Sequence, residues 1–205
     1  CRRGIPLTRF VATVQGAHRV TAHTITLKCI ALCALLLFPS LTAAQTIPAL
    51  SQALTLKSHG GVELKVPAWS VQRSDDSVSV LARTPKKTSK GGFLTLVVAV
   101  EEGPSKTEVV DWTLVRDNIL GAAKGAGSDL SLALAGDWSG AEAFKGQRFE
   151  GVMTRAEREV SVRMVALLAS GVMVTVTALG PQGSDELTPI AEAVAASVTR
   201  SAQAP

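Results

Sequence analysis

The chain has 205 residues, 46% of them hydrophobic, with 21 Lys and Arg against 17 Asp and Glu. Five of the basic residues and no acidic residue lie in positions 1–44, so the rest of the chain holds 16 basic and 17 acidic residues. This balance, with no basic run longer than Lys86-Lys87, argues against a nucleic-acid partner. All three cysteines also lie in positions 1–44, so the remaining chain must fold without disulfides or thiolate metal sites.

An apolar run from Cys29 to Phe38 follows Lys28 and ends at Pro39. It is shorter than the roughly 20 residues that a membrane-spanning helix needs. A basic residue, a short apolar run and then small residues predict a signal peptide over residues 27–44, cleaved after Ala44. We therefore expect a periplasmic or secreted protein, with an uncleaved membrane anchor as the alternative.

Residues 1–26 contain no Met and no sustained apolar period. This segment is interpreted as an unstructured extension upstream of the true start, for which Leu27 and Val20 are candidates. Residues 45–53 are expected to form a flexible leader, and residues 201–205 a tail.

Period-two alternation begins at Leu54 and predicts a hairpin of residues 54–56 and 62–66 around Gly60-Gly61. A further strand is expected over residues 77–84. Residues 93–100 are nearly continuously apolar, as expected of a central strand.

The pattern then changes to helical spacing. Ser105 as N-cap and Glu108 three residues later predict a capping box. An apolar stripe follows, and Gly125-Ala126-Gly127 is expected to end the helix. The stripe consists of Val109, Trp112, Val115, Ile119 and Ala123.

Alternation predicts a strand over residues 129–135, with a turn and an irregular strand over 136–146. A long hairpin of residues 147–153 and 158–168 and a strand over 172–179 follow. The last element is a helix with the stripe Leu187, Ile190, Ala191, Val194 and Val198. The order predicts one α+β domain over residues 54–200, an antiparallel sheet of six to seven strands with a central and a C-terminal helix packed on it.

Several motifs resemble the PsbP/Mog-type fold, and among its bacterial members the small envelope proteins of the DcrB-like sort. They are the hairpin end Pro67-Ala68-Trp69, the long hairpin with Arg148, Phe149, Arg158, Val162 and Arg163, the strand end Thr177-Ala178, and the final Ser197 and Arg200. The resemblance covers residues 54–200. It implies a non-enzymatic accessory or binding protein and offers no catalytic residues to transfer.

The chemistry-bearing residues outside the signal region are few. His59 is the one histidine there, so a His-based triad or tetrahedral metal site is not expected. The acidic pairs Asp75-Asp76 and Glu101-Glu102 could bind a cation, but adjacent strand residues point to opposite faces. The segment GAAKGAGS (121–128) lacks the ending of a phosphate loop and follows a helix. We therefore expect no metal and no cofactor.

Trp69 and Trp138 are the candidate binding residues, each interpreted as either core or rim, whereas Trp112 lies on the helix stripe and is expected in the core. The arginines of the long hairpin, Arg148, Arg155, Arg158 and Arg163, alternate with Glu150, Glu157 and Glu159. A solvated, cross-paired charged face is the expected result.

Two functions follow from these observations. The favoured one is an exported, non-catalytic accessory or binding protein of the cell envelope that engages a protein partner. An exposed apolar patch of more than a few hundred Å² would support it. The alternative is a small exported hydrolase that uses Ser or carboxylate chemistry without histidine, which would need a deep pocket with convergent carboxylates.

Overall fold

The computed structural model describes residues 49–56, 61–73, 79–88, 90–103, 110–140, 144–155, 158–169 and 171–200. Residues 1–26, the predicted signal peptide with its cleavage site, and the tail 201–205 lie outside these ranges. The elements are β1 (Leu50–Leu56), β2 (Val62–Pro67), β3 (Ser70–Arg73), β4 (Ser79–Arg83), β5 (Thr95–Glu102), α2 (Trp112–Gly125), β6 (Asp129–Trp138), β7 (Lys145–Arg155), β8 (Arg158–Ala169), β9 (Val172–Gly180), α3 (Leu187–Ala196) and β10 (Thr199–Arg200).

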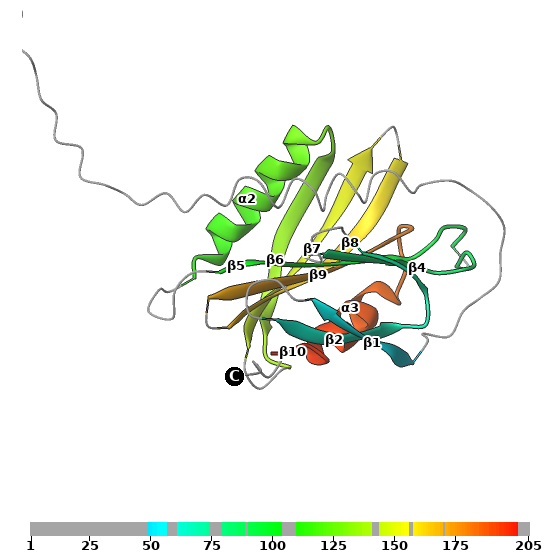
Figure 1. Ribbon diagram of the computed structural model, residues 1–205. Helices are drawn as coiled ribbons and strands as arrows, with labels where there is room; N and C mark the ends of the chain where they lie inside the picture. Colours follow the sequence, from blue (N-terminus) through cyan, green and yellow to red (C-terminus); the bar gives the residue numbers. More distant parts are fainter. Residues whose placement is uncertain are drawn as a thin grey trace, which may run out of the picture.

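A seven-stranded antiparallel sheet in the order β3-β4-β5-β9-β8-β7-β6 forms the centre of the fold. Helix α2 lies on one of its faces, and α3 lies on the other with a small sheet of order β1-β2-β10 (Figure 1). The predicted α+β class with two helices packed on an antiparallel sheet is confirmed.

Two hydrophobic cores lie on opposite faces of the large sheet. The larger one joins the sheet to α3 and to the small sheet, and the smaller one includes Ile119 of α2. Strand β8 shows the division, since Val165 and Leu167 belong to the larger core and Val162 and Met164 to the smaller. Strands buried on both faces are apolar at nearly every position, which explains the continuous apolar run of β5.

The long hairpin is confirmed, and it extends beyond its predicted ends. Strands β7 and β8 pair from Lys145 opposite Leu168 to Arg155 opposite Arg158. The predicted stripe of the C-terminal helix is also confirmed, because all of its residues belong to the larger core. Within the described part of the chain, no helix has the length and apolar character needed to cross a membrane.

Two element starts differ from the prediction. Strand β1 begins at Leu50, so residues 50–53 pair with β2 rather than belonging to a leader. Helix α2 begins at Trp112, and its N-cap is Asp111, whose side chain accepts hydrogen bonds from the Thr113 and Leu114 amides at 2.9 and 3.3 Å. An N-cap carboxylate satisfies the otherwise free amides of the first turn. The predicted capping box at 105–108 lies outside the described residues.

The predicted helix stop and the irregular strand after it both have a backbone cause. Gly127, at φ +73°, follows α2, and its amide donates to the Lys124 carbonyl while the Ser128 amide donates to the Ala123 carbonyl, as in a Schellman motif. Strand β6 does not end at Ala135, because a bulge between Leu134 and Gly136 lets it continue to Trp138.

Candidate functional site

Trp69 and Trp138 do not form an exposed rim. Their side chains are 6% and 7% exposed, and both belong to the larger core. Trp69 follows a tight turn in which its amide donates to the Pro67 carbonyl at 2.7 Å. Trp138 lies opposite Gly146, and its ring is close to the space where a Gly146 side chain would be. The rim interpretation of these two residues is therefore corrected to core.

The remaining tryptophan, expected in the core, lies at the edge of the smaller core. Trp112, half-buried at the start of α2, packs against the smaller core, with its ring edge-on to that of Phe149 at a centroid distance of 6.5 Å. Aromatic pairs prefer this arrangement. The three tryptophans thus contribute to stability, and none of them presents an open stacking platform.

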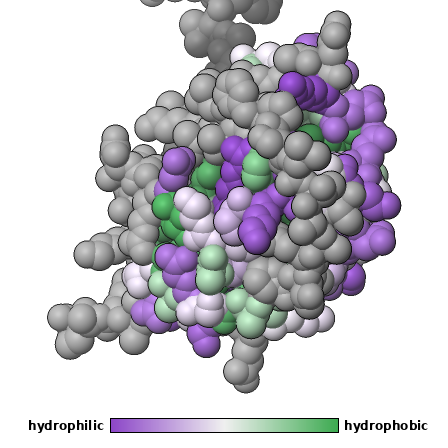
Figure 2. Space-filling model, turned by 90° about the vertical axis from the view of Figure 1, so that its right-hand side faces the viewer, coloured by the Kyte–Doolittle hydropathy of each residue, from purple (hydrophilic) through white to green (hydrophobic). Residues whose placement is uncertain are grey.

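Large apolar side chains are scarce on the described surface. Leu114 and Leu134 are its exposed large hydrophobic residues. On the face of the molecule in Figure 2, hydrophobic residues form small groups among hydrophilic ones. A broad apolar docking patch is therefore not seen among the described residues of this face.

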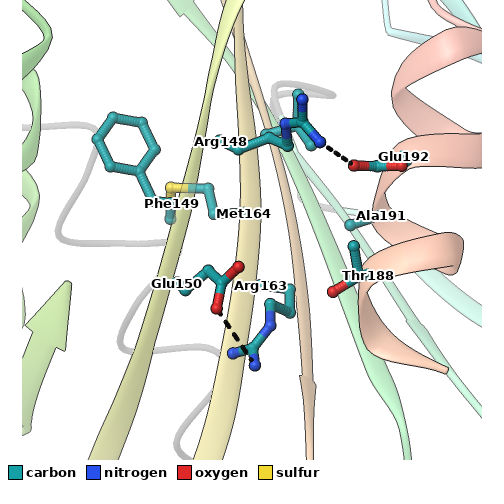
Figure 3. A pocket seen from close by; sticks show the side chains of 9 residues that line it. Arg148, Phe149, Glu150, Arg163, Met164, Thr188, Ala191 and Glu192 are labelled. Carbon is teal, nitrogen blue, oxygen red and sulfur yellow. Dashed lines mark hydrogen bonds and ion pairs between the residues drawn. The ribbon is translucent and has the colours of Figure 1, made fainter. Parts of the chain in front are cut away.

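A charged cleft between α3 and the β7–β8 hairpin is the best-defined candidate site. Its enclosed space is small, about 10 Å³ or room for about one water molecule, and its polar side chains come from β7, β8 and α3 (Figure 3). We call the set Arg148, Glu150, Arg163, Thr188 and Glu192 the charged cleft.

Strand register explains why these side chains meet. Arg148 and Glu150 are two residues apart on β7, so they share a face, and Arg163 of β8 lies directly opposite Glu150. Phe149 and Met164, between and beside them, point to the other face of the sheet (Figure 3). Helix α3 completes the cleft with Thr188 and Glu192, which are four residues and so about one helical turn apart.

Two ion pairs organise the cleft. An Nη1 atom of Arg148 donates to Glu192 at 3.1 Å, and an Nη2 atom of Arg163 lies 3.5 Å from Glu150 (Figure 3). Arg148 also donates two hydrogen bonds to the Asp137 carbonyl, at 3.2 and 2.8 Å. Arg148 therefore links three elements, namely β6, β7 and α3.

The head groups of the cleft are held in place but reach solvent. The side chains of Arg148 and Glu192 are 43% and 35% exposed, and those of Arg163 and Glu150 are 30% and 52% exposed. Such pairs contribute little to stability, typically below about 1 kcal/mol. Their orientation makes them suited to recognising polar groups of a partner.

The cross-paired face predicted from the hairpin is confirmed for Glu150 and Arg163. The pairing of Arg148 with Glu192 was missed, because the two residues are 44 positions apart and no local pattern connects them. Glu159 accepts a hydrogen bond from Gln182, which follows β9. Glu157 and the side chain of Arg155 lie outside the described residues.

Two other charged groups lie away from the cleft. The Arg83 guanidinium lies 3.9 Å from the centre of the Phe93 ring, and burial lowers the pKa of Arg83. Glu101 is 7% exposed, whereas Glu102 is exposed, as expected of adjacent strand residues. Burial raises the pKa of the Glu101 carboxyl.

The structure describes only part of the remaining predicted motifs. His59, Asp75 and Asp76 lie outside the described ranges. Within those ranges, no three His, Cys, Asp or Glu side chains gather as metal ligands would. Several residues between Leu120 and Leu130 border an open depression of about 530 Å³ at the end of α2, where the segment acts as a helix stop.

No protein-family model and no curated protein matches the chain. Among solved structures, the chain is similar to a protein of Bacteroides thetaiotaomicron (10% identity, TM-score 0.49, 69% of this chain), of whose length it spans 46%. It is also similar to PA94 of Pseudomonas aeruginosa, a protein of unknown function (13%, 0.38, 64% of this chain and 85% of that one). A third is LpqN of Mycobacterium tuberculosis, involved in cell envelope biogenesis (13%, 0.43, 72% and 90%). These similarities are too weak to assign a family, so the PsbP/Mog-type and DcrB-like resemblance stays a prediction.

Proposed function

We propose that the protein is an exported, non-catalytic accessory protein of the cell envelope, and that it binds a protein partner through the charged cleft. The observation that carries the proposal is the pair of half-exposed ion pairs, held by register and by α3 at one junction of sheet and helix. Fixed, accessible charges of both signs favour specific recognition of a complementary polar surface. The predicted signal peptide supports export to the envelope.

The proposal treats the cleft as a recognition surface rather than an active site. Both carboxylates in it are paired with arginines, and its space of about 10 Å³ is far below the roughly 300–1,000 Å³ of common ligand pockets. These features favour binding over the alternative of a histidine-free hydrolase.

Chemical crosslinking in the intact producing cell, followed by affinity recovery and mass spectrometry, tests the proposal. We expect one dominant envelope protein with the unsubstituted chain and its loss with Arg148→Glu, because charge reversal repels Glu192. Arg116→Glu is the matched control, since Arg116 also forms an ion pair, with Asp117 at 2.8 Å, but lies on α2 away from the charged cleft. Circular dichroism confirms that both variants are folded.

Glu192→Gln tests the role of the charged cleft independently, since it removes one charge while keeping the side-chain size. Recovery of the same partner with all three variants would place binding outside the charged cleft. Absence of any reproducible partner would contradict the binding function, and turnover of ester, amide or glycoside substrates by the purified protein would then favour the hydrolase.

A further inference from the structure

The outer edge of β6 has an uncharged, proline-free stretch before its bulge. Strand β6 is the last of the seven-stranded sheet and pairs with β7; among the described residues no strand pairs with its other edge. Natural edge strands usually carry Lys, Pro, inward-pointing charges or bulges that limit further pairing, and the bulge of β6 lies beyond Leu134. The segment LSLALAG, residues 130–136, has no charge and no proline.

The two faces of this edge differ in side-chain size. Leu130, Leu132 and Leu134 lie on the face covered by α2, where Leu132 is 8% exposed and Leu134 is 42% exposed. Ser131 and Ala133, both small and exposed, lie on the opposite face. An added strand would therefore find a row of leucines on one face and little steric obstruction on the other.

We propose that two copies of the protein pair antiparallel through their β6 edges, with Leu132 opposite Leu132 of the second copy. A two-fold axis perpendicular to the sheet relates the copies, and the two seven-stranded sheets become one continuous sheet. Edge-to-edge addition lets backbone N–H and C=O groups of both edge strands hydrogen-bond to each other, as in other cases of strand addition. This association rests on β6 and is independent of the charged cleft.

Side-chain pairing selects the register. In such a pair, symmetry places one residue opposite its own copy, and opposite residues share a face. With Leu132 on the axis, Leu130 lies opposite Leu134 of the second copy, so the exposed Leu134 gains an apolar neighbour. Ser131 then lies opposite Ala133, which leaves the small residues together. Cross-strand apolar pairs of this kind contribute about 0.2–1 kcal/mol each.

The neighbouring registers are less favourable. With Ala133 on the axis, only residues 132–134 of each copy would pair within the regular segment before the bulge, so Leu130 would have no apolar partner on the second copy. With Ser131 on the axis, Leu134 would lie opposite Ser128, which precedes the strand, so Leu134 would stay uncovered. The bulge between Leu134 and Gly136 limits the regular paired segment to residues 130–134 of each copy.

Light scattering after size exclusion of the exported protein, over a range of concentrations, tests the association. We expect twice the monomer mass for the unsubstituted protein and the monomer mass for Leu134→Lys. Leu114→Lys is the matched control, because Leu114 is also an exposed leucine, 58% exposed, but lies on α2; we expect it to remain dimeric. A monomer mass for the unsubstituted protein at every concentration, or a dimer that survives Leu134→Lys, would overturn the proposal.

Disulfide formation tests the register without adding charge. Opposite residues have Cβ atoms about 4.5–5.5 Å apart, whereas diagonal ones are about 7–8 Å apart. Leu132→Cys should therefore form a covalent dimer on oxidation, and Ala133→Cys should not. The unsubstituted protein, oxidised in parallel, shows any contribution from Cys1, Cys29 and Cys33. Crosslinking through position 133 but not 132 would overturn the proposed pairing.

Discussion

The role of a single side chain in this protein depends on which other residues cover it. Trp69 and Trp138 belong to no apolar stripe of the sequence, yet both lie in the larger core. Replacing either by Ala would remove core packing at a cost of about 3–5 kcal/mol, so such variants would report on folding rather than on binding. Arg148, by contrast, is half-exposed and can be exchanged with little loss of packing.

Glu101 is the buried charged residue with a clear pH consequence. Met173 of β9 lies directly opposite it, and Leu168 of β8 follows in the same row of the sheet. Burial raises the pKa of Glu101 above the ordinary value of 4.5. The folded state therefore binds a proton more tightly than the unfolded state, and stability falls as pH rises from about 4.5 through the raised folded pKa.

We expect Glu101→Gln to raise the free energy of unfolding at neutral pH and to weaken its dependence on pH above 4.5, because the neutral amide has no charge to desolvate. Glu102→Gln is the control, since the exposed Glu102 side chain should change stability little. Urea denaturation at several pH values measures both effects. An unchanged pH profile in Glu101→Gln would show that Glu101 does not cause the dependence.

The pairing of β6 with β7 depends on a close approach at one glycine. A Cβ atom placed on Gly151 would lie 1.8 Å from the Ser131 carbonyl oxygen, so any side chain there would force the strands apart. The Ser131 hydroxyl also bonds to the Val152 amide and carbonyl, both at 3.3 Å. Because α2 packs on β6, the strand, the helix and the smaller core depend on this contact.

We expect Gly151→Ala to lower the free energy of unfolding by about 1–3 kcal/mol, the usual cost of overpacking. Gly121→Ala is the matched control: its Cβ would meet open space on α2, and Ala in a helix interior is favoured over Gly by about 0.5–1 kcal/mol. Urea unfolding, monitored by circular dichroism, measures whether each substitution raises or lowers the free energy of unfolding. Equal effects of both substitutions would contradict the close-approach explanation.

The two helices that cover the large sheet bury different numbers of apolar residues. Helix α3 contributes five buried residues to the larger core, namely Leu187, Ile190, Ala191, Val194 and Ala195. Helix α2 is longer, yet its fully buried residues are Ile119 and Ala123. Fewer buried apolar contacts predict that α2 opens locally at a lower free energy than α3.

Native-state hydrogen exchange should therefore show faster exchange of the α2 amides than of the α3 amides, with the central strand β9 slowest, because β9 is paired on both sides. Mass spectrometry of peptic fragments resolves the three elements. Protection of α2 equal to that of α3 would show that the two layers unfold as one unit.

Local patterns predicted most of the elements but not their surroundings. Alternation and apolar stripes identified the long hairpin, β9 and α3, because strand and helix periods are properties of the backbone and need no partner. The irregular stretch after residue 135 was expected, but its cause, a bulge that keeps β6 paired to Trp138, depends on the register with β7. The position of α2 differed because its cap is Asp111, one turn or more beyond the capping-box pattern.

The amino-acid pattern was therefore sufficient for the α+β class, the antiparallel strands and the two packed helices, since each depends on spacing along the chain. The burial of Trp69 and Trp138 and the Arg148–Glu192 pair required the folded chain. The reason is that burial and ion pairing depend on which element covers a residue. At the charged cleft that element is α3, whose Glu192 meets a strand residue 44 positions earlier in the sequence.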